Sequence, residues 1–363
     1  MSQETLSALT LVCLKGLSAS MAMCLYKKYE SATLALEHLD EVPARFRKKV
    51  LEALPEAQER AKVELDFCKQ KNIQVLIFSD EGYPARLREC EDAPLVLFYR
   101  GVANLNEKRI ISVVGTRKIS ERGKSICQNF CKELATLIPD CVVVSGLAYG
   151  VDIHSHRACL ENSLPTVAVL AHGLDRIYPS LHRSTAIEML NQGGLLTEFL
   201  SGTNPDKGNF VRRNRIVAGM SDATIVVESA SHGGAMITAR LAQGYGRDVF
   251  AFPGRVTDQM SEGCLKLIKT NVAGLVTNAA DVLEAMSWAS VKPHSAPIQR
   301  ELFPALTPQQ ERLCDLLRGT EGLTINQMVV ASDMPFSDVA TELFNLEMDG
   351  VVQLLAGGIY RLL

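Results

Sequence analysis

Six short apolar runs alternate with helical segments between residues 109 and 286, and this alternation constrains the fold more than any other feature of the chain. The runs occupy residues 110–114, 142–144, 166–170, 195–197, 224–227 and 249–252. Helical segments are expected at residues 120–137, 151–160, 181–191 and 235–246. Fully apolar strands separated by helices predict an α/β fold, in which helices cover both faces of an extended, Rossmann-like, mostly parallel sheet.

The segments on either side of this region have a different pattern. Residues 1–68 place apolar side chains at helical spacing and predict a small helical domain. Its break at residues 15–18 resembles the turn of helix-hairpin-helix or SAM-like modules, but any short turn between helices needs a small residue, so DNA contact here is the less favoured alternative. Further apolar runs at 75–78 and 95–99 place the Rossmann-like domain at residues 69–287.

The end of the chain predicts a linker followed by a winged-helix-like domain. Prolines mark the linker at residues 288–306, and three helices with a hairpin around Gly357 and Gly358 make up residues 307–363. The third helix, at residues 336–348, carries Asp338, Glu342 and Glu347 and no basic residue. Helices that recognise bases usually carry Arg, Lys, Asn or Gln, so an interaction or regulatory role is favoured over recognition of a duplex.

The composition of the 363-residue chain limits the classes of protein to consider. Its formal net charge is −3, so nucleic-acid binding would need a local basic patch. Its ten cysteines show no CxxC or Cys/His spacing, which predicts no metal site and reduced cysteines in a cytoplasmic protein. Neither a signal peptide nor an 18-residue apolar run is present, so no membrane association is expected.

Residues 141–152, CVVVSGLAYGVD, join a buried strand to a helix through a turn of small residues. Backbone amides at such a strand end, supported by a helix N-terminus, attract phosphate. The alternative is a tight turn with no ligand. Asp152, at the start of the helix, is a better candidate for a capping residue than for a catalytic acid.

Three further loops repeat this combination of small, hydroxyl and basic residues. Because the carboxyl ends of parallel strands share one edge of the sheet, all four loops are expected to form one phosphate-binding site. The predicted site residues are Gly115, Thr116, Arg117, Ser145, Gly146, Leu147, Ala148, Gly150, Lys207, Asn209, Phe210, Arg213, Asn214, Arg215, Gly233, Gly234 and Thr238.

The most basic window of the chain is residues 207–215, with four cations in nine positions. If this window is helical, Arg212 and Arg215 share a face. Phe210 offers a flat surface on which a nucleobase could stack, although a core position is equally compatible with the sequence. A basic run can also be a solvated surface, and that alternative stays open.

Cofactor motifs are missing from the sequence. The run from Gly146 to Gly150 is not GxGxxG, and GxxxxGK[ST] does not occur, so neither a nicotinamide cofactor nor ATP hydrolysis is supported. No cofactor is therefore expected.

Five ordered motifs resemble the DNA-processing protein A family, also called DprA or Smf. They are GTRKIS at 115–120, SGLAYGVD at 145–152, NFVRRNRIVAGMSD at 209–222, GGAMITA at 233–239 and VFAFPG at 249–254. The resemblance spans roughly residues 70–286. Thr116 replaces the serine of many members and keeps the hydroxyl, whereas His232 stands where a small residue is expected.

The resemblance implies a non-enzymatic protein that binds single-stranded DNA, protects incoming DNA, forms a homodimer and loads the recombinase RecA during natural transformation. Carried over by position, Arg117, Lys207, Phe210 and the SGLAYG loop are the expected strand contacts.

Two other classes of function stay open. The fold also occurs in nucleoside-monophosphate phosphoribohydrolases with a PGGxGTxxE motif, but Arg240 occupies the place of their carboxylate. A cation there would oppose the positive charge of the transition state. Asp222 and Glu228 are spare carboxylates better explained as strand-end or capping residues. The third possibility is a scaffold that grips partners through its two flanking domains.

Overall fold

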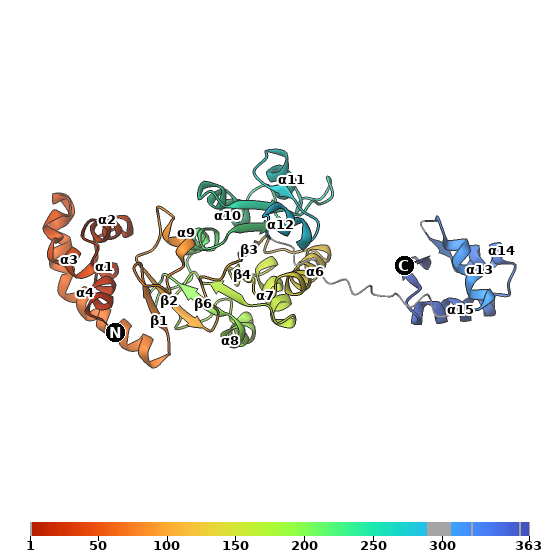
Figure 1. Ribbon diagram of the computed structural model, residues 1–363, viewed down its shortest axis with the longest axis horizontal. Coiled ribbons are helices and arrows are strands. Elements are labelled where there is room, and N and C mark those ends of the chain that lie inside the picture. Colours follow the sequence, from red (N-terminus) through yellow and green to blue (C-terminus); the bar gives the residue numbers. More distant parts are fainter. Residues whose placement is uncertain (1, 289–305, 321, 356, 363) are drawn as a thin grey trace. The chain divides into compact units, whose positions relative to one another are not determined.

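The computed structural model describes residues 2–288, 306–320, 322–355 and 357–362. The chain divides into two compact units, residues 1–290 and 291–363 (Figure 1). Each unit has its own hydrophobic core. The linker predicted at residues 288–306 lies almost entirely outside the described residues. Within those described ranges, no helix has both the length and the apolar character needed to cross a bilayer.

A nine-stranded sheet, in the order β1-β2-β6-β5-β4-β3-β7-β8-β9, organises the first unit. The six strands predicted from apolar runs are β3 (Ile110–Val114), β4 (Val142–Ser145), β5 (Thr166–Val169), β6 (Gly194–Thr197), β7 (Ala223–Val226) and β8 (Asp248–Ala251). These six pair in parallel, as does β9 (Gly274–Leu275) at one edge. At the other edge, β1 (Gln74–Ile77) and β2 (Val96–Gly101) pair antiparallel. The mostly parallel sheet is thus confirmed.

Helices cover both faces of the sheet because alternate strand residues point to opposite sides. On one face, Ile111 and Val113 pack with α6 (Glu121–Leu137), α7 (Val151–Glu161) and α12 (Ala279–Ala285). On the other, Ile110 and Val114 pack with α9, α10 and α11. The bounds of these last helices are Lys207–Gly219, Gly234–Gly244 and Glu262–Lys269. The remaining helix of the parallel region, α8 (Arg183–Gln192), packs with α7.

The order of the strands reverses at β3. From β3 the chain builds β4, β5 and β6 in one direction, and it then returns to build β7, β8 and β9 in the other. In open α/β sheets such a reversal leaves a crevice beyond the carboxyl ends of the strands. The fold therefore predicts a ligand site beside β3.

The N-terminal helices pack against the antiparallel edge of the sheet. They are α1 (Gln3–Cys13), α2 (Ala19–Tyr29), α3 (Ala32–Glu37) and α4 (Ala44–Gln70), and a short α5 (Ala85–Arg88) follows β1. Their apolar side chains share one core with Ile77 of β1 and Phe98 of β2. The expected boundary at residue 68 falls inside the last turn of α4, and the core continues across it.

The second unit contains three helices and a small antiparallel sheet in the order β10-β12-β11. Its elements are α13 (Pro308–Leu317), β10 (Leu323–Thr324), α14 (Ile325–Ser332), α15 (Phe336–Met348), β11 (Val352–Leu355) and β12 (Ile359–Leu362). Thr307 and Thr324 begin α13 and α14 with capping boxes, in which each threonine and a glutamine three residues later bind each other's backbone amides. The predicted three helices and hairpin are present.

Candidate nucleic-acid interface

A pocket of about 630 Å³ opens at the carboxyl edge of the sheet, beside β3. Its walls come from the loops after β3, β4, β6, β7 and β8 and from helices α7, α9 and α10. The predicted residues that line it are Gly115, Thr116, Arg117, Gly146, Ala148, Lys207, Phe210, Arg213, Asn214, Gly233, Gly234 and Thr238. The four loops named from sequence therefore meet in one place.

The loop after β3 is fixed by its own backbone. Thr116 donates its amide to the carbonyl of Glu228 at 2.7 Å, and its carbonyl accepts the amide of Val151 at 3.1 Å. The Thr116 hydroxyl accepts the amide of Lys118 at 3.1 Å. These bonds join the ends of β3, β4 and β7 and leave the Arg117 side chain exposed at the pocket.

Two backbone amides of the segment after β4 donate hydrogen bonds within the protein, although the sequence predicts that the amides of this turn are free to bind phosphate. Ala148 donates its amide to the carboxylate of Asp152 at 3.3 Å, and Val151 donates to Thr116. Gly150 has a positive φ of 78°, and a Cβ there would overlap the Thr116 carbonyl. Asp152 thus binds an amide of the loop before α7 and not an amide of the helix, whose N-cap is Gly150, so the capping role preferred from the sequence is not the one it has here.

Arg213 lies beneath this loop and is buried. Its guanidinium donates to the carbonyl of Gly146 at 2.6 Å and also to the carbonyl of Val169. Burial lowers the pKa of Arg213 to about 10, with Asp152 acting in the opposite direction, so the side chain stays charged at neutral pH. Burial raises the pKa of Asp152, and Arg213 opposes that shift. Arg213 therefore supplies positive charge from inside the wall of the pocket.

Phe210 lines the pocket and lies close to two other side chains. The Arg117 guanidinium carbon is 5.0 Å from the centre of the Phe210 ring, and the Tyr178 ring centre is 5.9 Å away on a tilted plane. Phe210 is only half-buried, so it is not a core phenylalanine. Lys207, one turn earlier on α9, is exposed and lines the same pocket.

Five predicted residues do not line the pocket. Ser145 is buried and donates its hydroxyl to the Val113 carbonyl at 2.6 Å. Leu147 is also buried, and Gly150 serves the turn described above. Asn209 donates its side-chain amide to the carbonyl of Asn204 at 3.0 Å.

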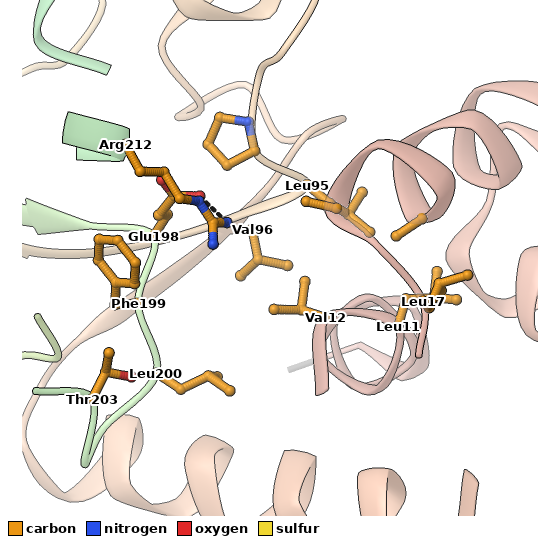
Figure 2. Close-up of a pocket in the computed structure, with 13 residues that line it drawn as sticks. Leu11, Val12, Leu17, Leu95, Val96, Glu198, Phe199, Leu200, Thr203 and Arg212 are labelled. Atoms are coloured by element: carbon orange, nitrogen blue, oxygen red, sulfur yellow. Dashed lines mark hydrogen bonds and ion pairs between the residues drawn. The ribbon is translucent and has the colours of Figure 1, made fainter. Parts of the chain in front are cut away.

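Arg215 is the fifth, and the structure turns it away from the predicted site. It pairs at 2.6 Å with Glu198, whose side chain is 1% exposed, and Arg212 pairs with the same oxygen at 2.6 Å. The shared face predicted for Arg212 and Arg215 is present, but it faces the end of β6. There Arg212 borders a second pocket of about 250 Å³, where Leu11, Leu95 and other apolar side chains form most of the wall (Figure 2).

The loop after β7 combines a buried carboxylate with a glycine turn. Glu228 accepts the amide of Ser120 at 2.9 Å and also its hydroxyl, so it holds Ser120, the N-cap residue of α6. The Thr238 hydroxyl donates to the Gly234 carbonyl at 3.0 Å, and Asn214 reaches the same carbonyl at 3.4 Å. His232 is exposed and lines the pocket where a small residue was expected.

Sequence reasoning missed some residues of the interface. Met260 and Pro205 are among the further residues that line the pocket, and the Met260 sulfur accepts a hydrogen bond of 3.5 Å from the Thr116 hydroxyl. Tyr178 lies beside Phe210, next to the pocket. An aromatic residue in the loop after β5, at the same edge of the sheet, was the available signal for Tyr178.

Comparisons with known proteins match both units. A family model described as DNA recombination-mediator protein A matches residues 74–287, and a DprA winged helix domain model matches residues 298–358. The chain is 34% identical to Protein Smf of Escherichia coli K12 over 310 residues, which is 84% of this chain and 82% of that protein. It is 39% identical to the DNA processing protein DprA of Streptococcus pneumoniae R6 over 218 residues, 60% of this chain and 75% of that protein.

Two solved structures support the same grouping. The X-ray structure of DNA processing protein A from Streptococcus pneumoniae superposes with a TM-score of 0.63 at 31% identity, covering 78% of this chain and 98% of that one. A structure of DNA processing protein A from Helicobacter pylori, which concerns its single-stranded DNA binding mode, has a TM-score of 0.53 at 29% identity. It covers 59% of this chain and 95% of that one.

Proposed function

The chain belongs to the DNA recombination-mediator protein A family, and from this premise we propose that its pocket binds single-stranded DNA with little sequence preference. Relatives named for DNA processing support a role in recombination. The binding proposal extends this role to a site and a ligand on this chain.

One observation carries the proposal: Arg117, Lys207 and Phe210 line one pocket, although Arg117 comes from the loop after β3 and the other two from the distant helix α9. A guanidinium and an ammonium can neutralise neighbouring phosphates, and Arg213 adds charge from below. Because the whole chain has a net charge of −3, these cations form the local basic patch that nucleic-acid binding would need. A half-exposed aromatic ring among them, that of Phe210, suits an unpaired base, because a base within a duplex has no free face to offer.

The first prediction concerns the two cations. Arg117→Ala and Lys207→Ala should each weaken binding to a short oligothymidylate roughly ten- to hundredfold, because each removes a charged contact to phosphate. Each should also reduce the dependence of affinity on salt, by about 0.7 in the slope of log K against log salt. Fluorescence anisotropy over a range of salt concentrations measures both quantities.

Lys132→Ala is the matched control, since Lys132 is an exposed cation on α6 outside the pocket. It should leave affinity and slope unchanged. If Arg117→Ala and Lys207→Ala bind as the native chain does, the pocket is not the strand-binding site. Equal affinity for a duplex of the same length would contradict the preference for single strands.

We further propose, from the family resemblance, that the protein protects incoming strands and loads RecA onto them, as a cytoplasmic homodimer. The test is the rate at which RecA assembles on strands coated with single-strand-binding protein. The native chain should increase that rate, and Arg117→Ala should not. A molecular mass in solution equal to one chain would contradict the dimer.

We also propose that the pocket binds rather than catalyses. Glu228 binds Ser120 at the start of α6, Asp152 holds the amide of Ala148, and Arg240 is exposed on α10. None of these residues offers the carboxylate that glycosidic cleavage needs at the ribose. Release of free base from a nucleoside monophosphate, measured by chromatography, would favour the phosphoribohydrolase alternative.

A further inference from the structure

Tyr178 presents an aromatic ring to solvent beside the pocket. Its side chain comes from the loop between β5 and α8, and 47% of its surface is exposed. The ring centre is 5.9 Å from that of Phe210, with an angle of 55° between the planes. Tyr178 therefore touches a residue of the pocket without lining it.

The backbone under Tyr178 is held by a buried histidine. The Tyr178 amide donates to Nε2 of His172 at 3.2 Å, while Nδ1 of His172 faces the carbonyl of Gly173 at 2.9 Å. His172 must be neutral for Nε2 to accept, and burial lowers its pKa in the direction that keeps it neutral. The backbone that carries the exposed ring is thus held from inside the protein.

This arrangement differs from that of a packing residue. A core tyrosine would be buried and would pair its hydroxyl, as Tyr83 does with the Pro94 carbonyl at 2.7 Å. Among the described residues, the Tyr178 hydroxyl has no hydrogen-bond partner. The nearby Arg176 is paired with Asp175 at 2.8 Å and with Asn204 at 2.6 Å, so Tyr178 is the feature that this part of the loop offers to a ligand.

We infer that Tyr178 forms a second base-stacking subsite, which takes the nucleobase next to the one stacked at Phe210. The inference rests on the proposed function, since the ligand is the same single strand. Two rings 5.9 Å apart and tilted by 55° cannot share one base between parallel faces, but they can each take one of two neighbouring, splayed bases. The Arg117 guanidinium lies over the Phe210 ring, and there it would be close to the phosphate that connects the two bases.

The test compares Tyr178→Ala with Tyr178→Phe in binding to a short oligothymidylate. Tyr178→Ala should weaken binding about tenfold, the loss of one stacked base, whereas Tyr178→Phe keeps the ring and should bind as the native chain does. The salt slope should stay unchanged in both, because neither substitution removes a charge that binds phosphate. An unchanged affinity of Tyr178→Ala would overturn the inference.

A role in merely supporting Phe210 is separated by the double variant. If Tyr178 binds its own base, Tyr178→Ala should weaken binding by a similar factor in the native chain and in Phe210→Ala. If it acts only through Phe210, it should have no effect in the Phe210→Ala background, which would overturn the inference.

A change in the DNA removes any concern that a variant has misfolded. Oligothymidylates with one abasic position, scanned along the strand, should show a position that costs the native chain about tenfold and costs Tyr178→Ala nothing. If the native chain binds the oligonucleotide but no such position is found, the second subsite is overturned and the proposed function is not. Failure of the native chain to bind any single strand would instead overturn the proposed function.

Discussion

At the scale of single residues, Gly146 shows why a glycine can mark a site without itself binding a ligand. A Cβ on Gly146 would overlap the guanidinium of Arg213. Arg213 in turn binds the Gly146 and Val169 carbonyls, and so ties the loop after β4 to the end of β5. The missing side chain makes room for an internal cation as well as opening the pocket.

Gly146→Ala should therefore lower the free energy of unfolding by about 1–3 kcal/mol, because the interior around Arg213 is already filled. It should also weaken binding to single strands, since displaced Arg213 no longer fixes the loop. Urea unfolding and anisotropy measure the two effects.

Gly208→Ala is the matched control for stability. Gly208 lies in the first turn of α9, and a Cβ there would meet no neighbouring atom within 4 Å. Alanine favours helix, so this variant should be neutral or more stable by up to about 1 kcal/mol. Equal effects of the two substitutions would show that Arg213 does not depend on the space at Gly146.

At the scale of elements, α9 connects two different environments. One side presents Phe210 and Asn214 to the pocket. The other side directs Arg212 and Arg215 to Glu198 at the end of β6. The basic window of the sequence is thus divided between a ligand surface and an internal ion pair, and its charge cannot be assigned to DNA as a whole.

Glu198→Gln should lower the free energy of unfolding by about 3–5 kcal/mol, because Arg215 is then left as a buried cation without its partner. Arg212→Gln removes a half-exposed partner of the same carboxylate, and its cost should stay below about 1 kcal/mol. Denaturant titrations of both variants give the comparison. If both variants lose a similar free energy of unfolding, burial does not determine how much each ion pair contributes to stability.

At the scale of the whole molecule, the cations of the pocket belong to the first unit, and the second unit is acidic. Its helix α15 carries Asp338, Glu342 and Glu347 and exposes Phe336 and Phe344. Such a surface repels a phosphate backbone and suits a protein partner better. The interaction role predicted for this domain stays a prediction.

Removal of all residues beyond Ser287 should leave affinity for single strands within about twofold of the native value, because it removes no cation of the pocket. The loss of even one cation that pairs with a phosphate would weaken binding by more than about twofold. The truncation keeps the sheet and every residue that lines the pocket. Anisotropy of the truncated and full chains on the same oligonucleotide is the measurement. Loss of binding would move the site to the second unit.

The sequence by itself determined the parallel sheet, its helices and the edge at which Arg117, Gly146 and Lys207 meet. These follow from local periodicity and from the rule that parallel strands end at one edge, both of which are written in short segments. Only the tertiary structure decided which face of α9 meets the pocket, and so separated Arg213 and Asn214 from Arg215. It also decided that the amide of Ala148 is paired internally and that Tyr178 stands beside Phe210. The rotation of a helix and the approach of distant loops depend on packing summed over the whole core, which no single segment encodes.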